Sequence, residues 1–251
     1  MKNESFELWL IWQNPETRQR YHVGNLLYEE GVYLFSYENG EYRRKLAEAM
    51  DNGYQTHLAF PDINKTYTSK NLFGPFSRRL PDSRRPDYQL VLQELGLSKE
   101  ATELEVLRAT GGILATDSYE FVSPIKVEDN DFELDFFIAG WRYYDGEKVI
   151  DNLHEGDNIK LCLAPNNEYD HKAVKVMSVK GNKLGFIPAF YSGWMFEIIE
   201  KECIYKAKIQ TINPQAVPHR KVNISIAGKV NQFVDIEVVL DDKEKLRAVM
   251  S

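Results

Sequence analysis

The strongest constraint on the fold lies in the second half of the chain, where short apolar runs recur at close intervals. Each run is rich in Val, Ile and aromatic residues, which favour a half-buried strand, and Gly, Asn or Pro separates one from the next. The runs are FELDFFIAGW (132–141), DNIKLCLAP (157–165), KAVKVMSV (172–179), NKLGFIP (182–188), YKAKIQTI (205–212) and KVNISIAG (221–228). One helix, SGWMFEIIEKE (192–202), interrupts them. The pattern predicts a small, partly closed β-barrel over 132–230.

The first half mixes helical and extended patterns. Strands are expected at 6–13, between 21 and 40 with Gly24, Gly31 and Gly40 at turns, and at 114–124; helices are expected at 41–50, at 87–97 with a stop at Gly96, and from Ser98 onward. The acidic stretch KVEDNDFELD (126–135) follows Pro124 and indicates a boundary near 126–132. We therefore predict an α+β chain of two domains, with a mixed α/β module at 1–125, the barrel at 132–230 and a strand-and-helix tail at 231–251.

Composition limits the classes of function. With 43% hydrophobic and 27% charged residues, the chain is typical of a globular protein, and its net charge of −7 argues against a general polyanion binder. Residues 131–230 hold 13 basic and 13 acidic residues, however, which leaves room for a local positive site. No signal peptide or membrane-spanning run is evident, and Cys162 and Cys203 are expected to be buried thiols, so we expect a cytoplasmic protein.

The stretch APNNEYDHKAVKV (164–176) concentrates polar residues before an alternating strand and allows several interpretations. A metal site is disfavoured because Asp170 and His171 are adjacent and would point to opposite faces of a strand. A catalytic site is disfavoured because no serine or cysteine nucleophile lies close to His171 in sequence. A polar turn explains Asn166 and Asn167, whose side chains bond to nearby backbone, but it explains Tyr169 and Asp170 less well.

Three stretches in order resemble the HIRAN domain family. They are FIAGWRYYDG (137–146), LHEGDNIKLCLAPNNEYDHKAVKV (153–176) and GNKLGFIP (181–188), and the resemblance covers about 132–228. It implies an OB-like barrel that binds single-stranded DNA or a 3′ end, with aromatic side chains stacking on bases and polar groups contacting the terminal sugar and phosphate. The positions carried over are Arg142, Tyr143, Tyr144, Asn166, Asn167, Tyr169, Asp170, Lys172 and Phe186. In the eukaryotic domain basic residues follow the last motif, whereas this chain has Pro188, Ala189 and Phe190.

The first half is similar to the N-terminal subdomain of HipA-type toxin kinases. The stretches are YHVGNLLYEEGVYLFSY (21–37), FGPFSRRLPDSRRPDY (73–88) and LEVLRATGGILATDSYEFV (104–122), over about 8–123. No kinase core follows, and neither a Gly-rich nucleotide loop nor a catalytic-loop aspartate is present, so we expect no enzymatic activity and no cofactor. The resemblance implies a separate HipA-like kinase or HipB-like DNA-binding protein as partner. Within SRRLPDSRRPD (77–87), four arginines are candidates for contact with that partner or with DNA backbone: Arg78, Arg79, Arg84 and Arg85.

Two functional hypotheses remain open. In the first, the protein is a non-enzymatic DNA-binding and interaction protein of a toxin–antitoxin or mobile-element system. In the second, it restrains a HipA-like kinase through protein contacts and does not bind DNA, as the acidic net charge and the missing basic residues would favour.

Overall fold

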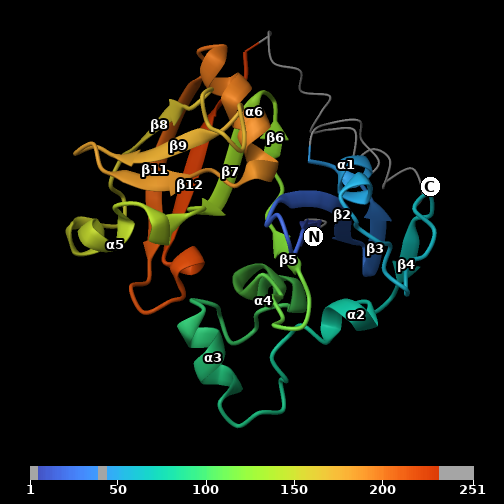
Figure 1. Ribbon diagram of the computed structural model, residues 1–251. Coiled ribbons are helices and arrows are strands. Elements are labelled where there is room, and N and C mark those ends of the chain that lie inside the picture. Colours follow the sequence, from blue (N-terminus) through green and yellow to red (C-terminus); the bar gives the residue numbers. More distant parts are fainter. Residues whose placement is uncertain (1–4, 39–43, 232–251) are drawn as a thin grey trace. The chain divides into compact units, whose positions relative to one another are not determined.

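The computed structural model describes residues 5–38 and 44–231, and these fall into two compact units (Figure 1). The division lies between Pro124 and Ile125, so the described part of unit 1 comprises residues 5–38 and 44–124, and that of unit 2 comprises residues 125–231. Gly40 and residues 232–251 of the expected tail lie outside the described residues.

Unit 1 consists of a five-stranded antiparallel sheet and four short helices. The sheet has the order β4-β3-β2-β1-β5. Its strands are β1 (Phe6–Gln13), β2 (Arg20–Glu29), β3 (Val32–Tyr37), β4 (Tyr67–Ser69) and β5 (Tyr119–Val122). The helices are α1 (Leu46–Asp51), α2 (Gly74–Ser77), α3 (Tyr88–Glu94) and α4 (Glu103–Thr110).

Strands β1 and β2 lie inside the sheet of unit 1, and each contains a run of consecutive buried residues, so both faces are covered there. The run LWLIW in β1 therefore needs apolar side chains at consecutive positions rather than at alternate ones. Gly24 lies inside β2 and not at the expected turn. A Cβ at this position would stand 2.8 Å from the Phe35 ring and 2.9 Å from the Ser36 carbonyl oxygen, so a close approach of β3 requires glycine there.

Helix α4 begins at Glu103, later than the expected start at Ser98. Thr102 caps it, because its hydroxyl accepts from the Glu105 backbone N–H while the Glu105 carboxylate accepts from the Thr102 N–H. Ser98 has Ala101 three positions later and cannot form this reciprocal box. Capping chemistry thus decides where the helix starts.

Unit 2 is built mainly from strands, as the sequence predicts. Its strands are β6 (Lys126–Glu128), β7 (Asp131–Phe137), β8 (Ile159–Leu163), β9 (Val174–Ser178), β10 (Lys183–Phe186), β11 (Ile204–Ile212) and β12 (Val222–Lys229). The helical elements are α5 (Gly146–Val149) and α6 (Ala189–Glu200) with the single 3₁₀ turns η1 (Trp141–Tyr143), η2 (Ile150–Asn152) and η3 (Pro218–Arg220).

The strands of unit 2 form two sheets, with orders β10-β9-β8 and β11-β12-β7-β6. Within the described residues these sheets meet at two isolated bridges, Ala139 with Phe186 and Asn158 with Lys208. The expected OB-like barrel is therefore not confirmed, although the two sheets are bridged at these two points.

Alternation along the strands separates the interior of unit 2 from its surface. In β7, Phe132, Leu134 and Phe136 are buried while the residues between them are not. In β8 the same alternation turns Cys162 outward, so the expectation of two buried thiols is wrong for Cys162 and confirmed for Cys203. No helix of the described residues has the length and apolar character needed to cross a membrane.

Candidate nucleic-acid interface

The bridge between β7 and β10 brings two of the predicted motifs side by side. The Ala139 N–H donates to the Phe186 carbonyl and the Phe186 N–H donates to the Ala139 carbonyl, both at 2.9 Å. Gly185 makes this approach possible: its φ is 153°, and a Cβ there would stand 2.4 Å from the Ala139 oxygen. The second glycine of GNKLGFIP, Gly185, is thus needed to place Phe186 beside the GWRYYDG segment.

Tyr144 and Phe186 form an aromatic pair at this junction. Their ring centroids are 5.5 Å apart with the planes at 70°, a favourable edge-to-face arrangement. The Lys183 Nζ lies 3.8 Å from the Tyr144 centroid and 4.2 Å from that of Phe186. Both rings and the lysine are half-buried, so one cation and two π-faces meet at a surface that solvent can reach.

Local packing fixes the backbone that carries Tyr144. Trp141 in η1 is buried, and Gly146 lies so close to its indole that a Cβ would stand 2.5 Å from the ring. The Trp141 indole N–H donates to Glu147 at 3.1 Å, and the Asp145 N–H donates to the Lys183 carbonyl at 2.9 Å. The motif residues Trp141 and Gly146 therefore serve as the support for Tyr144.

Two further tyrosines extend from the same region into solvent. Tyr143 is 69% exposed and Tyr169 is 82% exposed. The Arg142 guanidinium lies 4.7 Å from the Tyr143 ring centroid and donates to its hydroxyl oxygen. Burial and, to a smaller extent, the neighbouring Tyr169 raise the pKa of Tyr144.

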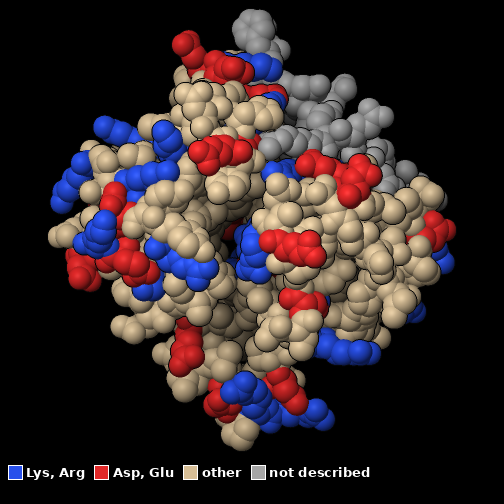
Figure 2. Space-filling model, viewed as in Figure 1, with Lys and Arg blue, Asp and Glu red and all other residues tan. Residues whose placement is uncertain are grey.

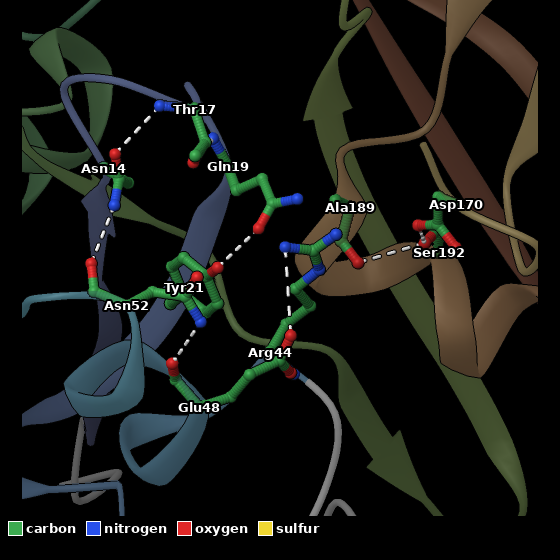
Figure 3. A network of polar contacts seen from close by, with 10 residues as sticks. All are labelled: Asn14, Thr17, Gln19, Tyr21, Arg44, Glu48, Asn52, Asp170, Ala189 and Ser192. Atoms are coloured by element: carbon green, nitrogen blue, oxygen red, sulfur yellow. Dashed lines mark hydrogen bonds and ion pairs between the residues drawn. The ribbon is translucent and has the colours of Figure 1, made fainter. Parts of the chain in front are cut away.

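The polar loop is held by its own side chains. The Asn167 Oδ1 accepts from the backbone N–H groups of Tyr169 at 2.9 Å and Asp170 at 3.0 Å. Asp170 Oδ1 accepts from the Lys172 N–H at 2.8 Å, and its Oδ2 accepts from the buried Ser192 hydroxyl at 3.0 Å (Figure 3). Asn167 and Asp170 thus fasten the loop to itself and to α6, and the exposed Tyr169 between them is presented by a fixed backbone.

The remaining predicted residues of unit 2, Asn166 and Lys172, differ in how freely their side chains can contact a ligand. Asn166 is exposed. Lys172 donates from Nζ to the Glu197 carboxylate at 3.0 Å, so its charge is partly neutralised within the unit.

Lys183 is the residue that the sequence reasoning missed. Strict alternation would put Lys183 and Phe186, three positions apart, on opposite faces of β10. A register shift between Lys183 and Gly185 adds one residue to β10 relative to β9, and this brings both side chains to the same face. The available signal was Gly185, because a glycine inside a strand pattern often marks a bulge.

The four candidate arginines of unit 1 do not form one contact surface. Arg79 is buried, where its guanidinium donates to Asp117 and, at 2.8 Å, to the Gly112 carbonyl, so this group has a structural role and is not accessible to a partner. Arg84 and Arg85 are exposed and pair with Asp82 and Asp87, as expected of a solvated loop. Hydrogen bonds from Arg84 lower the pKa of Asp82 to about 2. Arg78 is exposed.

A second polar cluster lies inside unit 1. The Lys45 ammonium contacts the Glu38 carboxylate at 3.2 Å and donates to His22 Nδ1 at 3.1 Å. Because Nδ1 accepts, Nε2 carries the hydrogen and donates to Asn25 Oδ1 at 2.7 Å. The His22 ring also stacks on Trp9 at 4.3 Å. Burial, and then the nearby Lys45, lower the pKa of His22 to about 3 despite the opposing effect of Glu38.

Unit 1 also contains polar contacts that hold its loops. Asn14 donates from Nδ2 to the Asn52 carbonyl at 2.7 Å, and the Arg44 N–H donates to Glu48 at 2.7 Å (Figure 3). Among the described residues, no group of three or more His, Cys, Asp and Glu side chains is arranged to hold a metal ion.

On the face shown in Figure 2, basic and acidic side chains are interspersed.

The comparison with protein families bears on unit 2. Residues 131–231 match the HIRAN domain family. The HIRAN resemblance is therefore confirmed for this region, which we call the HIRAN region. The match does not extend into unit 1, so the HipA-type resemblance stays a prediction. No curated protein matches the chain.

Solved structures give weaker likenesses. The crystal structure of the HIRAN domain of human HLTF is 21% identical, covering 45% of this chain and 87% of that one with a TM-score of 0.35. An NMR structure of the HLTF HIRAN domain in its DNA-bound conformation is 20% identical, covering 48% and 91%, with a TM-score of 0.31. A protein from Lactobacillus plantarum is 18% identical, covering 39% and 96%, with a TM-score of 0.34. TM-scores this low do not by themselves establish a fold or a function.

Proposed function

We propose that the HIRAN region binds single-stranded DNA, or a DNA strand at its 3′ end, through the surface around Tyr144 and Phe186. The observation that carries this proposal is the position of Lys183, whose ammonium lies within about van der Waals contact of both rings. Exposed aromatic faces beside an unpaired cation match the two requirements of single-strand binding, which are base stacking and charge attraction to the backbone.

The neighbouring side chains fit a strand end. Tyr143 and Tyr169 are exposed aromatic groups that can cover a base, and stacking contributes about 1–3 kcal/mol per base. Arg142 carries a guanidinium suited to a phosphate. The Asp170 carboxylate accepts hydrogen bonds from the Lys172 N–H and the Ser192 hydroxyl. A carboxylate is also a suitable acceptor for a terminal sugar hydroxyl.

Fluorescence anisotropy at low salt tests this function with three probes: an oligothymidylate with a free 3′ hydroxyl, the same strand with a 3′ phosphate, and a blunt duplex. We expect the free 3′ end to bind most tightly. Tyr144→Ala should weaken that binding about 5- to 150-fold, the equivalent of one lost stacking contact.

The matched control is Ile204→Ala, which removes another exposed apolar side chain of unit 2, 78% exposed on β11, and should leave the affinity unchanged. Circular dichroism of both variants establishes that the fold survives. Absence of binding to every DNA with a free 3′ end would rule out the proposal.

We also propose that the protein is not an enzyme and acts without a cofactor, in the reducing cytoplasm, where free Cys162 and Cys203 thiols persist. Unit 1, with its HipA-type sequence resemblance, would contact a HipA-like kinase or HipB-like DNA-binding protein in a toxin–antitoxin or mobile-element system. The exposed Arg78 and the loop with Arg84 and Arg85 are the candidate contacts.

The second candidate function is restraint of such a kinase without DNA binding. The net charge of −7 favours it, because an acidic protein is repelled by DNA at long range. Co-purification with a HipA-like kinase, combined with no measurable DNA affinity, would select this function over the first.

A further inference from the structure

The outward face of the sheet β10-β9-β8 has an unusual charge pattern. The strand register forms two rows across it: Lys160, Met177 and Lys183 in one, and Cys162, Lys175 and Phe186 in the other. All six side chains are exposed or half-exposed, whereas Leu161, Val174 and Val176 between them are buried. Three lysines therefore share one face with the aromatic pair, and none of the six residues is acidic.

These lysines lack the ion pairs that several other lysines of unit 2 have. Within residues 5–38 and 44–231, Lys160, Lys175 and Lys183 form no salt bridge, whereas Lys172, Lys221 and Lys229 pair with Glu197, Glu147 and Asp131. On the other sheet, the register also places acidic side chains in the lysine rows, with Glu133 in the row of Lys206 and Asp135 in that of Lys208. Carboxylates therefore share the rows of the lysines on the β11-β12-β7-β6 sheet, whereas none lies in the two rows of the β10-β9-β8 sheet.

The lysines are close enough to act on one another. Residues at diagonal positions on neighbouring strands are about 7–8 Å apart, which is the relation of Lys160 to Lys175. Burial, and then repulsion from Lys175, lower the pKa of Lys183. Cations that repel each other are stabilised when an anion binds between them.

We propose that this lysine face, formed by Lys160, Lys175 and Lys183, binds the sugar–phosphate backbone of the DNA strand as it leaves the Tyr144–Phe186 pair. The inference rests on the proposed function and extends it from a strand end to a track several nucleotides long. Lys183 touches the aromatic pair, Lys175 stands opposite Phe186, and Lys160 lies on the next strand, so the charges lead away from the pair across β9 to β8. Contacts of this kind are independent of base sequence.

The test measures the salt dependence of anisotropy for a short oligothymidylate of about three nucleotides and a long one of about twelve. The variant is Lys160→Gln combined with Lys175→Gln, which leaves Lys183 and both rings in place. Each phosphate contact on a single strand contributes about 0.7 to the slope of log affinity against log salt, so the long strand should lose about 1.4 in slope. Between about 50 and 200 mM salt, the wild-type affinity for this strand should fall about sevenfold more than that of the variant.

The matched control is Lys206→Gln with Lys208→Gln, which removes the same charge from the exposed face of the other sheet. It should keep the wild-type slope. If the lysine-face variant binds the long strand with the wild-type slope, the proposed backbone contact is refuted. An equal loss of slope for the short strand also refutes it, because both lysines would then lie at the strand end. Competition by polyglutamate as strong as that by DNA of equal charge also overturns it.

Failure of the track is distinguishable from failure of the proposed function. If Tyr144→Ala weakens binding of the short strand while the lysine-face variant has no effect, binding at the Tyr144–Phe186 pair is supported and binding of the strand along the lysine face is refuted. If wild type binds neither strand, the proposed function itself is refuted.

Discussion

The two units use their charged and aromatic side chains in opposite ways. In unit 1 the notable polar groups are inside: Glu38, Lys45 and His22 satisfy one another beneath the surface, and Arg79 is buried against Asp117. In unit 2 the notable groups are outside, where Tyr143 and Tyr169 extend into solvent. Polar groups that satisfy one another are explained by the fold, whereas exposed aromatic rings near unpaired lysines offer groups that a ligand could contact.

This contrast shows how a perturbed pKa should be interpreted. His22 has a strongly lowered pKa, which is often a mark of a functional site. Its partners are all supplied by unit 1, however, and the cause is mainly burial. The candidate interface of unit 2 is marked instead by half-buried Tyr144, Phe186 and Lys183 side chains in contact with one another.

The largest expected effect breaks the internal network of unit 1. Lys45→Met removes the ammonium that contacts the buried Glu38 carboxylate at 3.2 Å. Loss of one partner from a buried ion pair costs about 3–5 kcal/mol of unfolding free energy. Hydrogen exchange measured by mass spectrometry should show faster exchange than in wild type in peptides of β2 and β3. The exchange rate of peptides of β9 should not change. Lys206→Met, on the surface of unit 2, is the control, and equal exchange in both variants would contradict the role assigned to Lys45.

The next effect depends on pH. His22 has a folded-state pKa of about 3 and an unfolded value of 6.5, so below pH 6.5 the unfolded chain binds the proton more readily. Unit 1 should lose about 1.4 kcal/mol of stability per pH unit from about pH 6.5 down toward pH 3, and gain none above pH 6.5. Urea unfolding at several pH values checks this slope, and His22→Gln should reduce it. A slope as steep in the variant as in wild type would refute the assignment to His22.

The smallest expected effect on stability concerns the exposed Tyr169 of unit 2. Tyr169→Ala removes a side chain that is 82% exposed, so the unfolding free energy should change by less than about 0.5 kcal/mol. DNA affinity should fall nonetheless, because the ring is available for stacking. Thermal unfolding and anisotropy on the same preparation separate the two effects. A clear loss of stability would mean that Tyr169 belongs to the structure of the unit rather than to its interface.

Much of the local structure could be predicted from sequence. The strands of unit 2 and its long helix follow from alternation and from Gly, Asn and Pro between the runs, and β1 follows from one apolar run. The start of α4 was wrongly predicted at Ser98, because a serine alone was used as the signal and the glutamate three residues after Thr102 was overlooked. Cys162 was misplaced because an apolar neighbourhood in sequence does not say which face of a strand a side chain occupies.

The sequence by itself determined that residues 131–231 form a HIRAN region and that its motifs carry tyrosines, an aspartate and an arginine. The structure showed that Tyr143 and Tyr169 are exposed. Only the tertiary structure decided which charges are available. A bulge at Gly185 turns Lys183 toward Phe186, and the register of β8, β9 and β10 gathers three unpaired lysines on one face. The physical reason is that pairing depends on distances between strands, whereas sequence patterns report only which residues share a face of one strand.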